Sequence, residues 1–418
     1  MKQCDIAIIG AGITGLAAAR FLEADGHIVT VFEQFDEPKP LGAGLMLQPT
    51  GLACLAALGL DRSVIDASRK ILHIDGRTIS GRRVLDIGYG EIGAHVFGLG
   101  VHRATLFDTL YQAASDANIA IRTSSAIVDT KVDGDGRYLT GASGRRHGPY
   151  ALVIDASGAR SRVRDAHADV RSIRHYPYAA VWGVVAQPDD WPWPDTLAQR
   201  FDTAQNMLGI LPLGQRPGPG EALMAFFWSL RMKDYAAWHS AGIEPWQAYV
   251  ADYWPEAGKL AAQFVSVDDL TLATYPDVVL RRPYGDRIVF LGDAAHSTSP
   301  QLGQGANLAL ADALTLAGTL READTMAAGL GAYARQRKAH VRFYQIASRY
   351  LTPFFQSDSR LAPLLRDLTF GPMTKIPYIR REMVRTLAGI KTGLFTSFDP
   401  GDWGGAYRIK HGSNSLSP

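Results

Sequence analysis

The chain has little cysteine, little net charge and no long hydrophobic run. Its 418 residues include two cysteines, Cys4 and Cys54, and neither has a metal-ligating residue at close spacing. We therefore expect both to pack in buried segments of a protein from a reducing compartment, without a metal site. The net charge of +2 argues against a general nucleic-acid-binding protein.

No apolar stretch approaches the roughly 18 residues that cross a bilayer, and no internal repeat stands out. Because glycines interrupt the N-terminal apolar run, it does not match a signal peptide, and the predicted location is the cytoplasm. What is present is an ordinary globular composition, 47% hydrophobic and 20% charged. The length predicts two or three domains with a large core.

A glycine-rich turn near the N-terminus is the first chemical signal, Gly10-Ala11-Gly12-Ile13-Thr14-Gly15. It lies between a predicted strand over 5–9 and a predicted helix over 16–23, and a second predicted strand over 27–32 ends at Glu33. Strand, turn, helix, strand and terminal acid within about 30 residues are typical of a dinucleotide-binding βαβ unit.

Each position of this unit has a physical role. Gly10 permits the tight turn, Gly12 lets the backbone approach a pyrophosphate, and Gly15 lets the helix pack closely on the strand. Glu33, followed by Gln34, is placed to accept a hydrogen bond from a ribose hydroxyl.

A second segment, far along the chain, has matching features. Gly292-Asp293-Ala294-Ala295-His296 follows a predicted strand over 287–291 and leads through Pro300 to Gly303-Gln304-Gly305-Ala306-Asn307. The acid can accept hydrogen bonds from sugar hydroxyls. The start of the following helix, predicted over 308–320, offers free N–H groups to an anion. The two segments together predict a cofactor site.

These motifs resemble the FAD-dependent aromatic hydroxylases, the single-component flavin monooxygenases with the p-hydroxybenzoate hydroxylase fold. The resemblance spans residues 4–330. The tail, with Leu351-Thr352-Pro353-Phe354-Phe355 and Leu361-Ala362-Pro363, is loosely similar to the end of the ubiquinone-biosynthesis hydroxylases.

The resemblance implies FAD as cofactor, with Asp293 on the ribityl hydroxyls and Arg103 on the phosphates. Pro300 and Gln48 are candidates for the flavin face. The alternatives are a helix N-cap for Asp293, a solvated arginine for Arg103 and an ordinary loop residue for Gln48. The implied FAD contacts are Gly10, Gly12, Ile13, Thr14, Gly15, Glu33, Gln34, Arg103, Gly292, Asp293, Pro300, Gly303, Gly305, Ala306 and Asn307.

The family's middle signature, Asp-Gly-x-x-Ser-x-x-Arg, is altered here. The aligned run, from Ser157 to Arg164, has serine at the aspartate position, and an aspartate stands two residues earlier at Asp155. This pattern is more like flavin-dependent halogenases and some flavin reductases and dehydrogenases, so nicotinamide use is less firmly implied. Arg160, Arg162 and Arg164 could pair with a cofactor phosphate, and a solvated basic face is the alternative. His296 is interpreted as structural.

The predicted fold class is α/β: a Rossmann-type FAD-binding domain, an inserted antiparallel β-sheet substrate domain and a helical C-terminal segment. The predicted boundaries are 1–72, 98–171 and 277–330 for the FAD domain, 73–97 and 172–276 for the sheet domain, and 331–418 for the helical segment. Within the sheet domain, strands are predicted over 179–186, 207–212 and 222–228.

Aromatic residues are dense in the sheet domain, which predicts an apolar pocket for a small, fairly apolar aromatic molecule. The pocket candidates are Tyr178, Trp182, Phe201, Met207 and Phe227. Near the C-terminus, residues 376–398 carry apolar residues every three or four positions beside arginines. Such a helix packs on its own domain or on a second subunit of a homodimer, or it lies on a membrane surface.

The resemblance therefore implies an FAD-dependent monooxygenase that is reduced by NADPH or NADH and uses molecular oxygen. A flavin C4a-hydroperoxide would hydroxylate or epoxidise an aromatic or otherwise electron-rich substrate. The alternatives are a flavin oxidase, dehydrogenase or cyclase of the same fold, a flavin-dependent halogenase, and a non-enzymatic flavoprotein. The sequence identifies no general base and no metal site.

Overall fold

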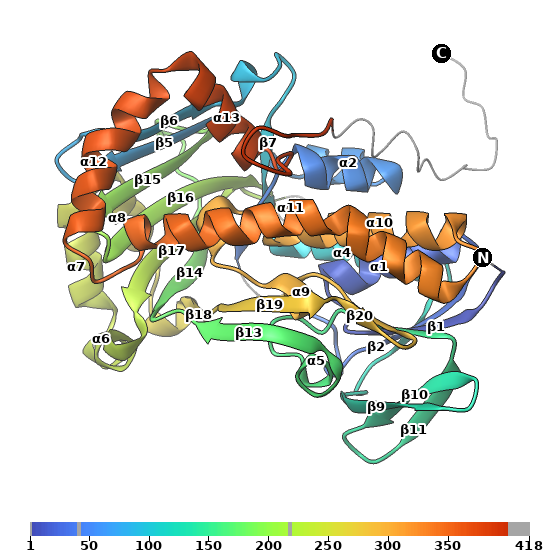
Figure 1. The fold of residues 1–418 in the computed structure, drawn as a ribbon. Coiled ribbons are helices and arrows are strands. Elements are labelled where there is room, and N and C mark those ends of the chain that lie inside the picture. Colours follow the sequence, from blue (N-terminus) through green and yellow to red (C-terminus); the bar gives the residue numbers. More distant parts are fainter. Residues whose placement is uncertain (1, 40–42, 216–219, 400–418) are drawn as a thin grey trace, which may run out of the picture.

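The computed structural model describes residues 2–39, 43–215 and 220–399, in which helices pack around two large sheets (Figure 1). The first sheet has six strands, in the order β20-β21-β12-β1-β2-β8. All neighbours pair in parallel except β20 and β21. The strands are Tyr284–Gly285 (β20), Ile288–Phe290 (β21), Leu152–Asp155 (β12), Asp5–Ile9 (β1), Ile28–Phe32 (β2) and Ala120–Arg122 (β8).

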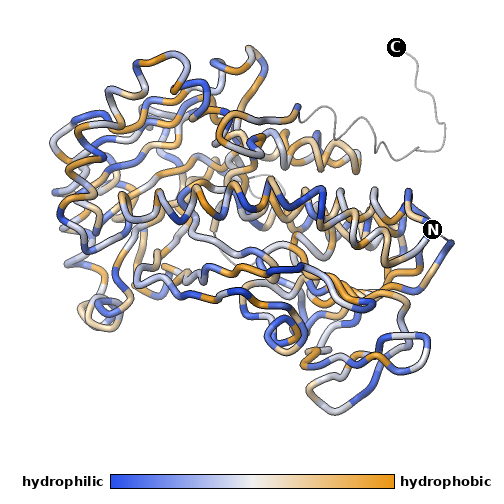
Figure 2. Tube along the Cα trace, in the orientation of Figure 1, coloured by the Kyte–Doolittle hydropathy of each residue, from blue (hydrophilic) through white to orange (hydrophobic). Residues whose placement is uncertain are grey.

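Both faces of this parallel sheet are covered, so its strands are hydrophobic along most of their length (Figure 2). On one face α1 packs against α4 and α10, and α10 packs against α2 and α11. On the other face a small antiparallel sheet, β9 to β11, shares a core with β1 and β12. The bounds are Ile13–Ala24 (α1), Pro49–Ala57 (α2), Arg103–Asp116 (α4), Gly305–Glu322 (α10), Met326–Phe355 (α11), Ile127–Asp133 (β9), Gly136–Gly141 (β10) and Arg146–Tyr150 (β11).

The second large sheet has seven strands in the order β18-β14-β17-β16-β15-β5-β6. The three predicted strands are present as β14, β16 and β17, whereas β15 was not predicted. The sheet is also not purely antiparallel, because β15 pairs in parallel with β5. The strands are Thr271–Ala273 (β18), Tyr178–Ala186 (β14), Leu223–Arg231 (β17), Asn206–Gly214 (β16), Thr196–Asp202 (β15), His73–Thr78 (β5) and Arg83–Gly88 (β6).

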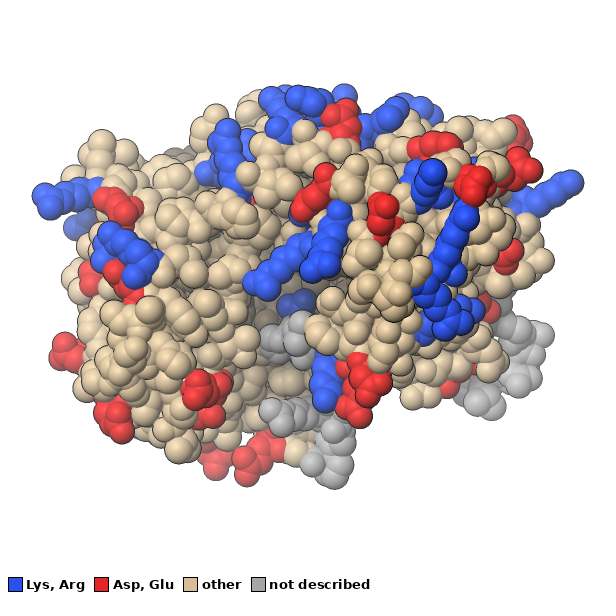
Figure 3. All heavy atoms as spheres, turned by 90° about the horizontal axis from the view of Figure 1, so that it is seen from below, with Lys and Arg blue, Asp and Glu red and all other residues tan. Residues whose placement is uncertain are grey.

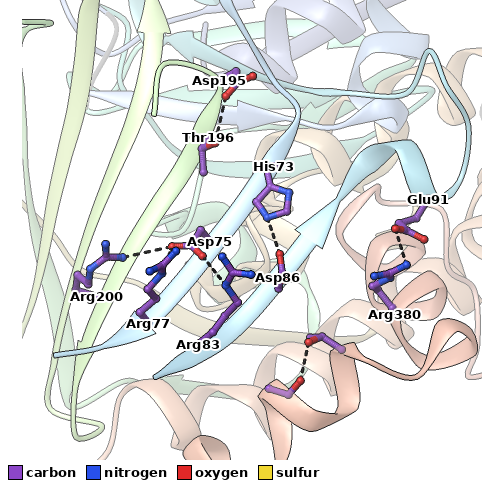
Figure 4. A network of polar contacts seen from close by, with 12 residues as sticks. His73, Asp75, Arg77, Arg83, Asp86, Glu91, Asp195, Thr196, Arg200 and Arg380 are labelled. Atoms are coloured by element: carbon purple, nitrogen blue, oxygen red, sulfur yellow. Dashed lines mark hydrogen bonds and ion pairs between the residues drawn. The ribbon is translucent and has the colours of Figure 1, made fainter. Parts of the chain in front are cut away.

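Charged residues join the distant strands β5, β6 and β15 (Figure 4). The largely buried carboxylate of Asp75 lies 2.8 Å from Arg77 and 3.2 Å from Arg83, and Arg200 on β15 is 3.6 Å away. A neighbouring ion pair, between Glu91 and Arg380, links the C-terminal helix α13 to the turn after β6. Ion pairs therefore support the pairing of β5 with β15, which are more than 100 residues apart, and no local sequence pattern predicts these ion pairs.

The outer face of the seven-stranded sheet is covered by three helices that were not predicted, and their tryptophans pack against β14, β16 and β17. These helices are Tyr235–Ala241 (α6), Ile243–Tyr253 (α7) and Pro255–Ala261 (α8). Two smaller sheets, β3-β7-β4 and β13-β19, connect the large ones. Their strands are Gly44–Leu47 (β3), Gly98–His102 (β7), Arg69–Ile71 (β4), Asp169–His175 (β13) and Pro276–Arg282 (β19).

The remaining elements are short or lie in the C-terminal part. Helix α2 ends at Ala57 and is followed, after a short turn, by a separate helix, α3. The apolar side of α13 packs on the chain itself, with Val384 buried. These elements are Asp61–Asp66 (α3), Arg162–His167 (α5), Asp293–His296 (α9), Leu361–Thr374 (α12), Pro377–Leu387 (α13) and the 3-10 turns Tyr89–Glu91 (η1), Met232–Asp234 (η2), Val267–Asp269 (η3) and Pro300–Leu302 (η4).

The predicted fold class is confirmed: a parallel-sheet domain of the dinucleotide-binding type, a second sheet domain and C-terminal helices. The exact domain boundaries stay a prediction. Within the described ranges, no helix combines the length and the hydrophobicity needed to span a membrane.

Candidate cofactor and substrate site

A single large cavity of about 1910 Å³ lies between the two large sheets. Ligand pockets usually measure about 300–1,000 Å³, so this cavity has room for a dinucleotide and a substrate together. One part of it is walled by the glycine-rich turns after β1 and β21. The other part is walled by the seven-stranded sheet and by α11.

The N-terminal turn forms a cradle at the first part of the cavity. Gly10, at φ +100°, bends the chain, and a Cβ on Gly15 would lie 1.9 Å from the Gly10 carbonyl oxygen. Only glycine at position 15 therefore lets α1 pack this closely on the turn. A Cβ on Gly12 would meet nothing within 4 Å, so its backbone borders open space. Gly12, Ile13 and Thr14 all line the cavity, whereas Gly15 does not.

Glu33 stands at the end of β2, where the βαβ pattern placed an acid. One carboxylate oxygen accepts from the N–H of Ala11 at 2.9 Å, and the other accepts from the N–H of Phe35 at 3.0 Å. The side chain is largely buried yet lines the cavity, and Gln34 lines it too. Because each carboxylate oxygen can accept more than one hydrogen bond, Glu33 retains capacity for a ribose hydroxyl.

Asp293 and Arg103 project into the same part of the cavity from different elements. Asp293 begins α9 and is exposed to the cavity, and Arg103 begins α4. The cavity walls enclose Arg103 although its side chain is open to solvent inside the cavity. This enclosure lowers the pKa of its guanidinium, and the charge of Asp293 opposes that shift. The carboxylate of Asp293, a group suited to sugar hydroxyls, thus lies near the guanidinium of Arg103, a group suited to phosphates.

A buried network holds the backbone just before Asp293. Asp312, on α10, accepts from the N–H of Gly292 at 2.9 Å and from Nε of Arg337 at 2.7 Å. His296 Nε2 donates to the same carboxylate at 2.5 Å. Burial alone would raise the pKa of Asp312, but the charges of His296 and Arg337 and the hydrogen bonds outweigh it and lower the pKa. These contacts hold His296 in the interior of the protein, which agrees with its interpretation as a structural residue.

The network continues to the C-terminal segment. A guanidinium nitrogen of Arg337 donates to Nδ1 of His340 at 2.6 Å, and His340 Nε2 donates to the carbonyl of Gly389 at 2.7 Å. Burial, together with the charge of Arg337, lowers the pKa of His340 well below its ordinary value. A neutral His340 with its proton on Nε2 fits both contacts.

The turn from Pro300 to Asn307 borders the middle of the cavity. Pro300, Gly303, Gly305 and Ala306 line it, but the Asn307 side chain is fully buried behind them. Its Oδ1 accepts from the N–H of Gln48 at 2.8 Å, and its Nδ2 donates to carbonyls of Met46 and Gly303. Asn307 therefore fastens the loop after β3 to the glycine turn rather than facing the cavity.

Gln48 lines the cavity beside this turn. Its Oε1 accepts from the Tyr89 hydroxyl at 2.6 Å, so its Nε2 is the end left to donate into the cavity. Tyr89 is buried, and burial raises its pKa, so the phenol remains a donor to Gln48. Because Tyr89 comes from a turn after β6, this orienting contact was not visible in the sequence.

The altered middle signature folds around Asp155. This buried carboxylate accepts from the N–H of Ser157 at 3.0 Å, from the Ser157 hydroxyl at 2.6 Å and from the Ser161 hydroxyl. Arg164 is buried too, and it donates to the carbonyl of Ala159. Asp155, two residues before the position of the family's aspartate, thus holds the turn in shape through these hydrogen bonds.

Two arginines of this signature remain at the cavity. Arg160 and Arg162 line it and are exposed, whereas Arg164 does not line it. Lys39 lines the cavity as well. Seen from below, the molecule is hollowed near the middle of the face, and Lys and Arg side chains stand at the edge of that hollow (Figure 3).

Three of the five predicted pocket residues line the cavity: Trp182, Met207 and Phe227. Trp182 and Phe227 stack with ring centroids 5.2 Å apart. Tyr178 and Phe201 do not line the cavity. Tyr178 donates its hydroxyl to Asp358 at 2.7 Å, and Phe201 lies behind the lining in a cluster with Met207 and Phe355.

Several lining residues were missed by the sequence analysis. β15 contributes Leu197 and Gln199, and the segment before β19 contributes Tyr275. The long helix α11 contributes a row of side chains at the spacing of one helix face, namely Arg335, Lys338, Ala339, Arg342, Phe343, Ile346, Ala347, Tyr350 and Leu351. The amphipathic spacing of α11 was the available signal, but it does not say which cavity the helix borders.

These features fit FAD. An open glycine cradle, a ribose-directed acid, a cation for phosphates and a second acid near a glycine turn line one continuous cavity. The class defined by fold and site is therefore that of FAD-dependent oxidoreductases with a dinucleotide-binding domain.

Comparison with known proteins agrees. The family model described as "FAD binding domain" matches residues 3–345, and the chain belongs to this family. Among curated proteins, the aurachin C monooxygenase/isomerase of Stigmatella aurantiaca is 27% identical over 87% of this chain and 92% of its own length. The 3-hydroxybenzoate 6-hydroxylase 1 of Aquipseudomonas alcaligenes is 26% identical over 90% of this chain and 95% of its own.

Among solved structures, Klebsiella pneumoniae HpxO complexed with FAD and uric acid aligns with a TM-score of 0.77 at 22% identity. The alignment covers 92% of this chain and 97% of that one, and it shows that the fold is shared. The resemblance to FAD-dependent aromatic hydroxylases is confirmed, as is an FAD-dependent monooxygenase function. FAD as the cofactor is confirmed as well. The role of each site residue stays a prediction.

Proposed function

We propose that this FAD-dependent monooxygenase hydroxylates a neutral, largely apolar aromatic compound, with NADPH or NADH as reductant. The observation that carries the proposal is the lining contributed by the seven-stranded sheet. In the described part of the chain, every residue that this sheet gives to the cavity is uncharged. These residues are Ile74, Leu85, Ile87, Trp182, Leu197, Gln199, Met207, Gly209, Leu211, Ala225, Phe227, Thr271 and Ala273.

On this side of the cavity the charged lining residues, Arg335, Lys338 and Arg342, come from α11 and not from the sheet. A ring that packs on the sheet meets no charged partner, which disfavours recognition of a carboxylate there, because a buried charge needs a partner. The uncharged sheet favours a molecule that buries a ring and an apolar substituent against its side chains. One curated relative is named for a product of this kind: a 2-heptyl-3-hydroxy-4(1H)-quinolone synthase of Pseudomonas aeruginosa, 26% identical to this chain, makes an aromatic ring system with an alkyl substituent.

A few polar atoms would orient such a ring. The indole N–H of Trp182 is buried without a hydrogen-bond partner among the described residues. Because this nitrogen is buried rather than exposed to the cavity, the indole would have to turn before it donates to a substrate oxygen, and the cost of an unpaired buried donor would favour that turn. Burial raises the pKa of Tyr275 to about 12, so this residue stays a neutral phenol and serves as a donor rather than a base.

The apolar walls also keep the reacting groups dry. When bound, FAD supplies the redox and oxygen chemistry, and the chain supplies position and the exclusion of water. Pro300 and Gln48, which border the cavity between the two walls, are the proposed flavin-face residues. Asp293 and Arg103 would hold the ribityl and phosphate groups.

For the reductant, the proposed phosphate contacts are Arg160 and Arg162. Both are exposed and line the cavity, and neither has an ion pair within the described residues. Guanidinium groups suit phosphates because they can bind two oxygens at once. Although Ser157 stands where the family has aspartate, Asp155 accepts hydrogen bonds from Ser157 and Ser161 and so holds the turn that carries both arginines.

The test begins with anaerobic mixing of the purified yellow protein with NADPH and, separately, with NADH. We expect flavin absorbance to bleach faster when a 2-alkyl-4-quinolone is present than when 3-hydroxybenzoate or urate is present. Under labelled oxygen, the quinolone product should carry one labelled atom.

Two controls sharpen the result. Arg160→Ala with Arg162→Ala should slow bleaching while FAD stays bound, whereas Arg145→Ala, elsewhere on the surface, should not. Labelled hydrogen peroxide without labelled product would instead identify an oxidase. Stimulation by the anionic compounds, 3-hydroxybenzoate or urate, alone would overturn the inference of a neutral substrate.

A further inference from the structure

Helix α12 presents a row of leucines to the outside. Leu361, Leu364, Leu365 and Leu368 follow the spacing of one helix face, and their exposed fractions are 61%, 54%, 43% and 52%. The row continues past the helix end to Ile376, which is 48% exposed. Large apolar side chains scattered singly on a surface are ordinary, but a contiguous row of this kind marks an interaction surface.

The exposed row is not the result of a loosely placed helix, because the opposite side of α12 is tightly docked. Arg366 is fully buried and donates to the carbonyl of Thr203 at 2.8 Å and to that of Phe354 at 3.0 Å. A Cβ on Gly371 would lie 2.4 Å from the carbonyl oxygen of Arg83, so α12 approaches β6 backbone to backbone. The leucines are thus held outward by a rigid support.

Positive charge borders both ends of the row. Arg360 immediately precedes α12 and Lys375 immediately follows it, and both are exposed. The only acid between them in the sequence is Asp367, which pairs with the buried Arg366 at 2.8 Å. No carboxylate in the described part of the chain forms an ion pair with Arg360 or Lys375.

We propose that α12 docks the protein on an anionic lipid surface, with the leucine row among the acyl chains. Apolar side chains flanked by cations are the pattern of a helix that lies in the plane of a membrane interface. Each cation near an anionic leaflet adds attraction that salt weakens. The proposed lipid-binding surface lies on α12. The arginine-rich stretch over 376–398, for which a membrane-surface position was one of the predicted alternatives, packs largely on the chain itself.

The charges also decide between a membrane and a second copy of the chain. In a parallel pair of α12 helices each cation would face its own copy, and in an antiparallel pair Arg360 would face Lys375. Either arrangement brings like charges together, and Asp358, the acid two residues before Arg360, is already paired with Tyr178 and Arg231, which disfavours association. An anionic lipid surface is complementary in charge.

The position of α12 also suits delivery of an apolar substrate. Phe370, on the docked side of the helix, lines the cavity together with Phe355. A molecule that leaves the lipid beside the leucine row would therefore be next to a helix that itself borders the cavity. This part of the argument rests on the proposed function, whereas the docking itself does not depend on the substrate.

The experiment is vesicle sedimentation of the full chain with FAD bound and no substrate. Phosphatidylcholine vesicles containing phosphatidylglycerol are compared with vesicles of phosphatidylcholine alone. We expect at least about tenfold stronger binding to the anionic vesicles at low salt. Leu364→Glu with Leu368→Glu should weaken that binding at least about tenfold. Arg360→Glu with Lys375→Glu should remove the preference for anionic lipid.

The matched control is Ile28→Glu with Val265→Glu, which adds two acids at exposed apolar side chains outside α12 and should bind like the wild type. Flavin absorbance shows that each variant is folded. No binding of the wild type to anionic vesicles, or equal binding by the leucine variant, would overturn the proposal. A wild-type dimer that the leucine variant dissociates would assign the row to a homodimer instead. Because no substrate is present, failure here leaves the proposed reaction untouched.

Discussion

The two walls of the cavity are built in opposite ways. The cofactor wall consists of glycine turns at the ends of parallel strands, with charged groups such as Asp293 and Arg103 facing inward. The substrate wall consists of a mostly antiparallel sheet whose inward side chains carry no charge within the described residues. The cofactor wall can recognise one fixed cofactor through backbone groups. In the substrate wall, single side chains can be replaced one at a time.

Because of this difference, substitutions in the two walls should have different measurable effects. Changes at the cofactor wall should release FAD or destabilise the fold, because its residues are tied to buried networks. Changes at the substrate wall should alter substrate binding while FAD stays bound, because sheet side chains can be replaced without moving the backbone.

The largest effect is expected at Asp312. Asp312→Ala would leave Arg337 and His296 buried without their shared carboxylate, which should lower the free energy of unfolding by about 3–5 kcal/mol. Urea unfolding measures this, and FAD should be lost with the fold. Asp324→Ala, at an exposed position, is the control and should change little. A stable Asp312→Ala protein would show that the cofactor wall does not depend on this network.

Asp293 should come next. Asp293→Ala removes a carboxylate that faces the cavity without a partner among the described residues, so the fold should survive. FAD affinity should fall about tenfold to a hundredfold, the range for hydrogen bonds to a charged group. Fluorescence of released flavin on dialysis measures the loss. Glu322→Ala, which removes an exposed acid at the C-terminal end of α10, should retain FAD. Unchanged affinity in the Asp293 variant would remove this residue from the site.

Trp182 tests the substrate wall. Trp182→Phe keeps an aromatic ring against Phe227 but removes the indole N–H. We expect KM for the apolar substrate to rise about tenfold with FAD content unchanged. Trp238→Phe, outside the cavity lining, is the matched control. If KM stays constant, the substrate does not use this donor.

The smallest effect concerns pH. Because the pKa of His340 is lowered in the fold, the unfolded chain takes up a proton near pH 6.5 that the folded chain does not. The stabilisation from neutral His340 is complete above that pH and is lost as pH falls through it, by under about 1 kcal/mol from pH 7 to pH 6. His340→Gln should flatten this part of the curve of unfolding free energy against pH. His95→Gln, at an exposed histidine, should leave the slope in place.

Much of the cofactor wall could be predicted because its signals are local. Gly10 to Glu33 and Gly292 to Gly305 are contiguous motifs, and Gly10, Gly292 and Gly303 adopt the positive φ angles that favour glycine. Asn307 belongs to the same motif, yet its side chain serves the loop after β3. The substrate wall was predicted less completely. β15 is short, mixed in polarity and pairs in parallel with β5, more than 100 residues away.

Some residues escaped prediction because their roles depend on distant partners. Tyr89 orients Gln48, which lies 41 positions earlier in the sequence. Asp312, on α10, accepts a hydrogen bond from the backbone N–H of Gly292, which precedes α9. Tyr178 and Phe201 looked like pocket residues because they are aromatic and lie near the predicted strands. Strand alternation does put both on the same face as cavity residues, because Tyr178 is four positions from Trp182 and Phe201 is two from Gln199. They lie nearer the strand ends, where contacts with Asp358 and Phe355 keep them out of the lining, and these contacts come from far along the chain.

The sequence by itself determined the class of cofactor and the βαβ unit, because glycine positions and strand-to-helix order act over a few residues. Only the tertiary structure decided how the cavity is assembled. Burial and long-range pairing brought β5 beside β15, placed Asp155 under the altered signature and turned the leucines of α12 outward. Those outcomes depend on which surfaces meet, and that is a property of the packed chain rather than of any one segment.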